Sequence, residues 1–133
     1  MSTKIKTTDG WKHAANPVAN SLGKYNLVWQ APASKTYTAG YNNLGKFTLS
    51  KGKWLIRLRL YTIAAWIRLG SAPDNAKYAS YKSYDAQDRN FYVNTCITLD
   101  VTEDTDIYVN VYRVAAGNNV TIWSRNIFAM KLK

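Results

Sequence analysis

The sequence predicts an all-β protein, an antiparallel sandwich or barrel of about eight strands. Two observations support this fold class: hydrophobic and polar side chains alternate with a period of two in several runs, and glycine, asparagine and aspartate separate those runs. The chain has 133 residues, which suits one domain of ordinary size. A hydrophobic fraction of 47% and an aromatic fraction of 14% exclude disorder as the main state, because disordered chains have little to bury.

The clearest predicted strand covers residues 54–61. Arg57, Arg59 and Tyr61 would lie on its polar face. Its hydrophobic face would consist of Trp54, Ile56, Leu58 and Leu60. This alternation is typical of a strand that buries one face and turns the other toward solvent.

Further strands are predicted on both sides of this run. The same alternation covers residues 91–101, 107–114 and 120–132, and shorter candidates precede it at 25–30, 36–39 and 46–49. The hydrophobic positions of the longer runs predict a core made of Trp54, Ile56, Leu58, Leu60, Phe91, Val93, Ile97, Leu99, Ile107, Val109, Val111, Ile122 and Phe128.

Glycines mark several of the predicted turns. Gly52 follows the run that ends at residue 49, and it can adopt the positive φ that a tight hairpin requires. Gly117 and Asn118 are the expected left-handed residues between the last two strands. Gly40 and Gly45 are also predicted to be turn residues, because no phosphate-binding loop surrounds them.

Two segments do not fit the strand pattern. Residues 1–24 show no clear period and are predicted to form an irregular N-terminal arm or attachment segment, so that the folded domain covers residues 25–133. Residues 71–89 form a long predicted connection, in which tyrosines spaced by three allow one or two helical turns. No stretch of about 18 apolar residues occurs and no apolar signal core follows the first residues, so we expect neither membrane insertion nor a secretory signal.

The charge of the chain is strongly positive. Eighteen Lys and Arg against eight Asp and Glu give a formal net charge of +10, and Asp9 is the single acid among residues 1–70. Such a field favours anionic partners such as nucleic acid or acidic glycans. It equally serves solubility and orientation within an assembly.

Catalysis is poorly supported, and we expect no enzyme, cofactor or metal. His13 is the sole histidine and lies in the predicted arm, while Cys96 is the sole cysteine and falls on a polar strand face. A calcium site could form in an acidic cluster near residue 103, but aspartate and threonine are also ordinary turn residues, and we favour the turn. The cluster consists of Asp100, Glu103, Asp104 and Asp106.

Aromatic residues occupy the non-core face of the last two predicted strands. Tyr108 and Tyr112 share one strand face, and Trp123 and Ile127 share another. A sheet face of this composition is typical of a subunit interface, so we expect a homo-oligomer that buries these four residues. The alternative is a second packed face covered by loops.

Basic residues interleaved with aromatics could also bind single-stranded nucleic acid. Phosphate contacts and base stacking would come from Arg57, Arg59, Tyr61, Trp66 and Arg68. This alternative function lacks the ribonucleoprotein signature of a known RNA-binding module.

Residues 44–58, Leu-Gly-Lys-Phe-Thr-Leu-Ser-Lys-Gly-Lys-Trp-Leu-Ile-Arg-Leu, resemble the strand entry of C1q/TNF-like jelly-roll domains. Residues 123–132, Trp-Ser-Arg-Asn-Ile-Phe-Ala-Met-Lys-Leu, are similar to the closing strand of trimeric head domains on bacteriophage tail or head fibres. The resemblance covers about residues 25–133 and implies a homotrimeric jelly-roll-like sandwich in a virion, made in the host cytoplasm. Because the preceding segment is short, it implies a capsid or tail accessory protein that docks by residues 1–24.

Such a module would bind a host-surface glycan or another virion protein. Sugar rings would stack on tyrosine at the loop tips, and Asp or Asn side chains would bond the sugar hydroxyls. The predicted ligand-binding residues are Tyr78, Tyr81, Tyr84, Asp85, Asp88, Asn118 and Asn119. For each tyrosine the alternative is packing within a loop or a subunit contact.

Overall fold

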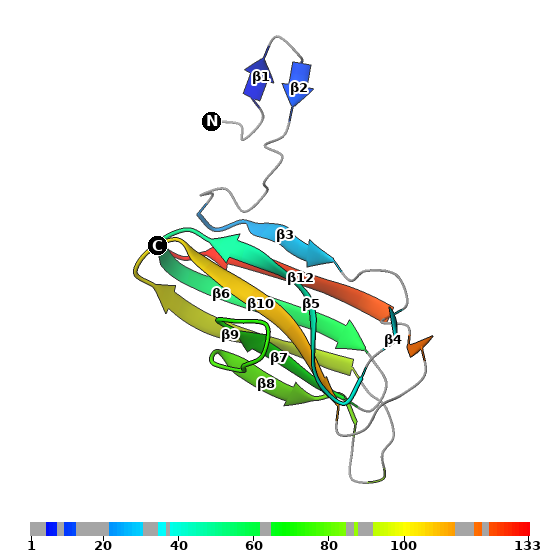
Figure 1. The fold of residues 1–133 in the computed structure, drawn as a ribbon. Coiled ribbons are helices and arrows are strands. Elements are labelled where there is room, and N and C mark those ends of the chain that lie inside the picture. The colour runs from blue at the N-terminus through cyan, green and yellow to red at the C-terminus, as the bar shows by residue number, and fades with distance from the viewer. Residues whose placement is uncertain are drawn as a thin grey trace.

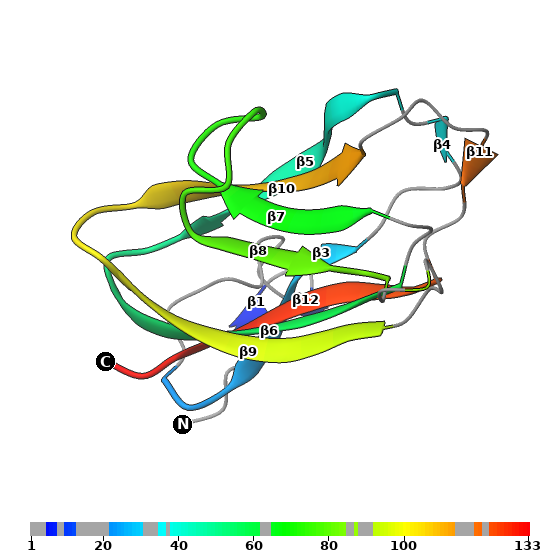
Figure 2. The same ribbon diagram turned by 90° about the horizontal axis from the view of Figure 1, so that it is seen from below.

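The structure is a computed structural model, and it describes residues 5–7, 10–12, 22–30, 35–36, 38–61, 65–84, 87, 92–113, 119–120 and 123–133. For residues 5–7, 10–12, 35–36, 61, 119–120 and 123–125 it describes the backbone alone. Within this part of the chain, two antiparallel four-stranded sheets pack face to face (Figure 1). The two layers are seen edge-on in Figure 2. No helix in the described segments is long and apolar enough to cross a membrane.

The first sheet has the strand order β3–β12–β6–β9. Its strands are β3 (Tyr25–Gln30), β12 (Trp123–Lys131), β6 (Gly52–Tyr61) and β9 (Tyr92–Val101). The second sheet has the order β5–β10–β7–β8, with β5 (Gly40–Leu49), β10 (Thr105–Arg113), β7 (Trp66–Gly70) and β8 (Ala79–Lys82). Two short pairs accompany them, β1 (Ile5–Thr7) with β2 (Gly10–Lys12) and β4 (Lys35–Thr36) with β11 (Asn119–Val120).

The connectivity of the two sheets is that of a jelly roll. When the eight sandwich strands are counted along the chain, without the short β4 and β11, the sheets have the orders 1-8-3-6 and 2-7-4-5. Strand 1 therefore pairs with 8, 2 with 7, 3 with 6 and 4 with 5, as if one long hairpin were rolled into two layers. The predicted all-β, jelly-roll-like sandwich is confirmed.

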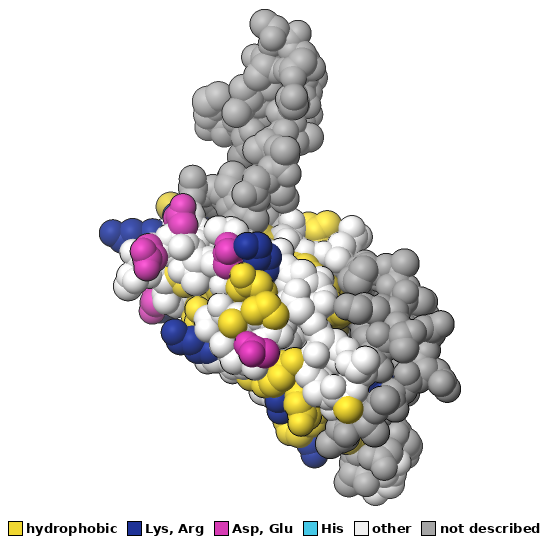
Figure 3. Space-filling model, in the orientation of Figure 1, with side chains coloured by type: hydrophobic (Ala, Val, Ile, Leu, Met, Phe, Trp, Pro, Cys, Tyr) yellow, Lys and Arg dark blue, Asp and Glu magenta, His cyan; other side chains and the backbone are white. Residues whose placement is uncertain are grey.

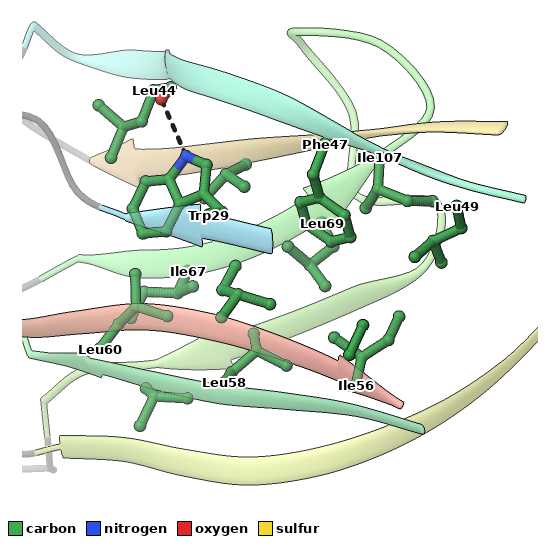
Figure 4. Close-up of a cluster of buried hydrophobic side chains, with 14 of the residues drawn as sticks. Trp29, Leu44, Phe47, Leu49, Ile56, Leu58, Leu60, Ile67, Leu69 and Ile107 are labelled. Atoms are coloured by element: carbon green, nitrogen blue, oxygen red, sulfur yellow. Dashed lines mark hydrogen bonds between the residues drawn. The ribbon is translucent and has the colours of Figure 1, made fainter. Parts of the chain in front are cut away.

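The core lies between the sheets and contains side chains from both layers (Figure 4). Alternate residues of β6 and β10 are completely buried, as their period of two predicts, and Val93 joins them from β9. Ile97 and Leu99 pack against this core in a partly buried position, whereas Phe91 and Ile122 lie outside the described residues. The Trp29 indole joins the two sheets at the edge formed by β3 and β5, because its Nε1 donates a hydrogen bond to the Leu44 carbonyl at 3.1 Å.

The predicted face assignment of the last strand was wrong. Ile127, expected on the outer face, is completely buried in the core, and Phe128, expected in the core, is partly exposed. The reason is a bulge: Trp123 pairs with Tyr61, but Asn126 pairs with Arg59, so β12 advances three residues while β6 advances two. An extra residue of this kind reverses the inward and outward alternation that follows it.

Gly45 was also assigned wrongly, because it lies inside β5 and not in a turn. Its φ of 110° marks a second bulge, at which the register shifts between Tyr108 and Asn110 on β10. The bulge lets Leu44 and Phe47, three residues apart, both enter the core. Gly40 likewise begins β5, and the predicted strand at residues 36–39 is replaced by the end of β4 and two residues outside any strand.

The predicted connection at residues 71–89 contains strand β8. Here the tyrosine spacing does not produce a helical turn: Tyr81 pairs with Ile67 across an antiparallel ladder. Backbone hydrogen bonds from Tyr78 to Leu69 and from Ser83 to Ala65 fix both ends of that pairing, at 2.9 and 2.8 Å. In the predicted irregular arm, the structure describes the β1–β2 hairpin together with residues 22–24.

Candidate functional site

The outer face of the second sheet is centred on Arg68, and we call it the covered face. The Arg68 guanidinium carbon lies 4.4 Å from the ring centroid of Tyr112 and 5.4 Å from that of Tyr41. Its NH1 donates to the Tyr41 hydroxyl at 2.9 Å, and its Nε donates to Ser80 Oγ at 3.0 Å. Tyr41 and Tyr112 meet edge to face with centroids 5.1 Å apart. Three strands and the edge strand β8 are therefore linked by one cation–aromatic cluster.

Lysines cover the remaining described rings of this face. Lys82 Nζ lies 5.2 Å from the Trp66 ring centroid and 5.4 Å from that of Tyr84. Lys46 Nζ lies 5.6 Å from the Tyr108 ring centroid. Because each of these rings already faces a cation, the covered face offers few free aromatic surfaces for stacking.

A loop also packs on the covered face, through Asn110. This side chain is completely buried, although its position on β10 is an outward one. Its Nδ2 donates to the carbonyls of Ala72 and Asn75 at 3.0 and 2.9 Å, and its Oδ1 accepts from Asn43 Nδ2 at 3.0 Å. Gly70 makes room for the loop, since a Cβ there would overlap Asn75. The loop-covered alternative therefore describes this part of the sheet.

The acidic residues near the β9–β10 turn make local contacts. Asp106 accepts from Lys46 Nζ at 2.8 Å and from Thr48 Oγ1 at 2.7 Å. The hydrogen bond from Lys46, followed by that from Thr48, lowers the pKa of Asp106, and the bond to Asp106 raises the pKa of Lys46. Asp104 Oδ1 accepts from the Lys51 backbone N at 3.2 Å.

These carboxylates behave as turn and strand residues. Among the described residues, no group of three or more His, Cys, Asp or Glu side chains could hold a metal ion. Most of the acidic side chains visible in Figure 3 lie toward the end of the sandwich that carries the C-terminus.

The outer face of the first sheet, which we call the open face, has a different character. Large hydrophobic residues are exposed there and along its border. Their exposed fraction ranges from 37% for Leu27 to 63% for Leu22. Leu22 bridges to Lys131 at the end of β12. The exposed set is Leu22, Tyr25, Leu27, Tyr92 and Leu132. All five belong to the first sheet or to segments beside it, so the exposed apolar surface is concentrated on one layer.

A shallow depression of about 180 Å³ lies on the open face. It is lined by Tyr25, Arg57, Arg59 and Phe128. Phe128 of β12 is the register partner of Arg57 on β6, and Tyr25 lies on β3, the next strand beyond β12. Neither arginine forms an ion pair with a described carboxylate. Cys96, the register partner of Arg57 on β9, is an exposed free thiol on the same face.

The predicted glycan-binding residues are not shown to form one site. Tyr78 and Tyr81 are partly buried and pack against the core, while Tyr84 lies beside Lys82. Asp85, Asp88 and Asn118 lie outside the described residues, and Asn119 is described by its backbone alone. Sugar binding by this set stays a prediction.

The predicted oligomer interface is divided between different environments. Tyr108 and Tyr112 are partly buried beside Lys46 and Arg68, and the Trp123 side chain lies outside the described part of the chain. Ile127 is buried between the sheets, so it has no exposed surface to offer to a second subunit. An interface at the two tyrosines stays a prediction.

The residues proposed for nucleic-acid binding lie on opposite sides of the sandwich. Arg57 and Arg59 lie on the open face, whereas Trp66 and Arg68 lie on the covered face, because β6 and β7 belong to different sheets. Tyr61 is described by its backbone alone. These residues therefore do not form one continuous surface, and nucleic-acid binding stays a prediction.

Sequence reasoning missed the aromatic side of the depression, Tyr25 and Phe128. The signal lay in the hydrophobic residues of the segment 25–29. There Tyr25 and Leu27 are exposed, Val28 is partly buried, and Trp29 is buried on the core side. The bulges in β3 and β12 hid this signal, because they break the simple alternation. Comparison with protein-family models, curated proteins and solved structures found no match for the chain, so functional inference rests on this geometry.

Proposed function

We propose that this protein is a non-enzymatic structural or adhesion module that works as a homo-oligomer and associates through the open face. The observation that carries the proposal is the concentration of exposed large hydrophobic side chains on one sheet of the sandwich. On the other sheet, the described rings of the outer face lie beside cations, and a loop packs over Asn110. Contact with a partner would therefore bury more exposed apolar surface on the open face than on the covered face.

A second copy of the chain is the occupant we favour. Burial of apolar surface contributes roughly 25 cal/mol per Å², and every copy brings the same exposed patch to the contact. Leu27 and Tyr25 of β3 lie at the edge of the first sheet, beside the exposed Leu22. In a trimer, each copy turns this same patch toward the threefold axis, so all of these side chains leave water together.

The trimer, the virion setting and the host-surface glycan follow from the sequence resemblance, and we propose them on that ground. A jelly-roll sandwich supports the proposal to the extent that it presents two broad sheet faces and many loops. In this arrangement the open face assembles the oligomer, and loops at the ends of the strands contact the glycan or a virion partner.

The mass of the protein in solution tests the proposal. Sedimentation equilibrium at micromolar concentration is expected to give three times the 15.1 kDa mass of the chain. Leu27→Glu, which places a carboxylate on the open face, is expected to lower that mass to the monomer value while thermal unfolding stays cooperative. A monomeric wild-type protein would contradict the proposal.

Ala39→Glu is the matched control for this experiment. Ala39 is exposed just before β5, on the other sheet, and the substitution introduces the same charge in place of an apolar side chain. We expect it to leave the oligomer intact. If Ala39→Glu and Leu27→Glu act alike, the assignment to the open face is wrong.

Single-stranded nucleic-acid binding is the second candidate, and the depression is the observation that favours it. Tyr25 and Phe128 could stack on bases while Arg57 and Arg59 contact phosphates. Fluorescence anisotropy with labelled oligodeoxythymidine at 20 to 200 mM salt, roughly the range over which such binding weakens steeply, tests it. Absence of binding at the lowest salt removes this candidate.

A further inference from the structure

Two cations lie together at the centre of the open face. Arg57 and Arg59 are two residues apart on β6, so their side chains project from the same side of the sheet. Arg57 is partly buried and Arg59 is exposed. The rings of Phe128 and Tyr25 line the depression beside them (on β12 and β3), so that cations and rings share one hollow.

The described carboxylates leave this pair uncompensated. Asp100, the acid on the outer side of β9, pairs in register with Lys53. Lys53 is six residues from Arg59 along β6, which is roughly 20 Å at the usual rise of a strand. Asp106 is held by Lys46 on the second sheet. Two like charges therefore lie beside each other with no described carboxylate paired to either of them.

The size of the hollow suits a small chemical group. Its volume of about 180 Å³ is well above the roughly 15 Å³ that a single water needs on the same measure. It is below the roughly 300 Å³ at which pockets for larger organic ligands begin. A single tetrahedral oxyanion, free or carried on a flat group, matches this size.

We propose that the depression formed by Tyr25, Arg57, Arg59 and Phe128 binds an oxyanion, a phosphate or sulfate group. The two guanidinium groups donate hydrogen bonds to its oxygens, because the guanidinium fork fits such anions better than an ammonium does. The rings contact the apolar part of the ligand, where the anion is attached to one. Binding removes the repulsion between the two arginines.

Anion binding has a consequence for assembly, and this part rests on the proposed function. If copies associate through the open face, the arginine pairs lie within or beside the contact. Taking guanidinium groups out of water without a partner is unfavourable. A bound oxyanion supplies that partner, so phosphate strengthens the oligomer.

The experiment uses the full chain with sodium phosphate, against sodium chloride at matched ionic strength. Isothermal titration calorimetry measures anion binding, and sedimentation equilibrium measures association. We expect phosphate to bind and the association constant to rise. The double variant Arg57→Gln/Arg59→Gln is expected to bind phosphate with an affinity reduced by about tenfold or more, because charge-assisted hydrogen bonds are lost.

Lys51→Gln/Lys77→Gln is the matched control, since it removes two positive charges at exposed positions outside the depression. It should bind phosphate as the wild type does. Equal loss in both double variants would mean a general charge effect and would overturn the site. Circular dichroism confirms that both variants fold.

The outcomes separate this inference from the proposed function. Trimers that ignore phosphate, with no heat of binding, overturn the anion site and leave the proposed assembly standing. Phosphate binding by a stable monomer keeps the anion site and overturns the assembly. Oligodeoxythymidine that binds much more tightly than inorganic phosphate, and loses that affinity in Arg57→Gln/Arg59→Gln, identifies a nucleic-acid backbone as the source of the anion.

Discussion

Replacement of Asn110 by alanine is the sharpest test of how the covered face is held together. Asn110 lies on the outer side of β10, yet it is completely buried beneath the loop that follows β7. Its side chain makes three hydrogen bonds, to the carbonyls of Ala72 and Asn75 and from Asn43. Asn110→Ala removes all three and leaves the two carbonyls without this donor.

The expected loss follows from the net value of each bond. An intramolecular hydrogen bond contributes about 1 kcal/mol, and a buried group left without its partner costs somewhat more. Three bonds therefore predict a decrease of about 2–4 kcal/mol in the free energy of unfolding. Urea denaturation measures this decrease, and in a domain of this size it lowers Tm by roughly 10 °C.

Asn94→Ala is the matched control for this change. Asn94 lies on the outer side of β9 and is exposed, so the same substitution is expected to change stability by less than about 0.5 kcal/mol. Asn110→Asp is a further comparison, because it keeps the size of the side chain and places an oxygen against two carbonyls. If Asn110→Ala were no more destabilising than Asn94→Ala, the covering role of the loop would be refuted.

Three other changes test separate parts of the structure. Gly70→Ala should destabilise the protein by at least about 1 kcal/mol in urea, since its Cβ would overlap the backbone of Asn75; an unchanged midpoint would contradict that contact. Leu58→Ala should cost about 2–5 kcal/mol, against less than about 0.5 kcal/mol for Leu22→Ala, because only the former empties a core position. The pKa of Asp106 is lower in the folded protein than its ordinary value of 3.8, so the ionised carboxylate stabilises the fold above that pH. This stabilisation is lost as the pH falls through the folded pKa. The stability difference between wild type and Asp106→Asn should therefore shrink from pH 5 to about pH 2.

The strands that could be predicted are those with strict alternation. In β6, β9 and β10 one face is mostly apolar at alternate residues, so a shift of one position would expose most of this set to water. The short β3 was also predicted with its observed bounds. Local pattern is enough in β6, β9 and β10 because the burial of one face determines the phase of every residue.

The features of the strands that could not be predicted depend on pairing with distant residues. The phase of β12 is set by a bulge opposite β6, and the course of β5 is set by the bulge at Gly45 opposite β10. Strand β8 has only two core-facing residues, Ala79 and Tyr81, which is too short a pattern to predict a strand, and it pairs with the edge that β7 offers. A bulge or a free edge depends on two strands together, so the sequence of one strand alone does not predict either.

The candidate sites show the same division. The basic charge and the outward arginines of β6 can be predicted from the chain alone. The neighbours of these arginines cannot be predicted in this way. Phe128 lies beside Arg57 because β12 pairs with β6, and the two residues are about seventy positions apart in the sequence. The same limit applies to Trp66 and Arg68, which sequence reasoning joined to the β6 arginines.

The chain alone establishes that the protein is all-β, which face of three long strands turns toward the core, and that its net charge is positive. Alternation along a strand decides these properties, because it needs only the contrast between water and a core. Which outer face is covered and which is open follows only from the assembled fold. That choice depends on which strands share a sheet and where one loop finds hydrogen-bond partners such as Asn110, and long-range pairing determines both.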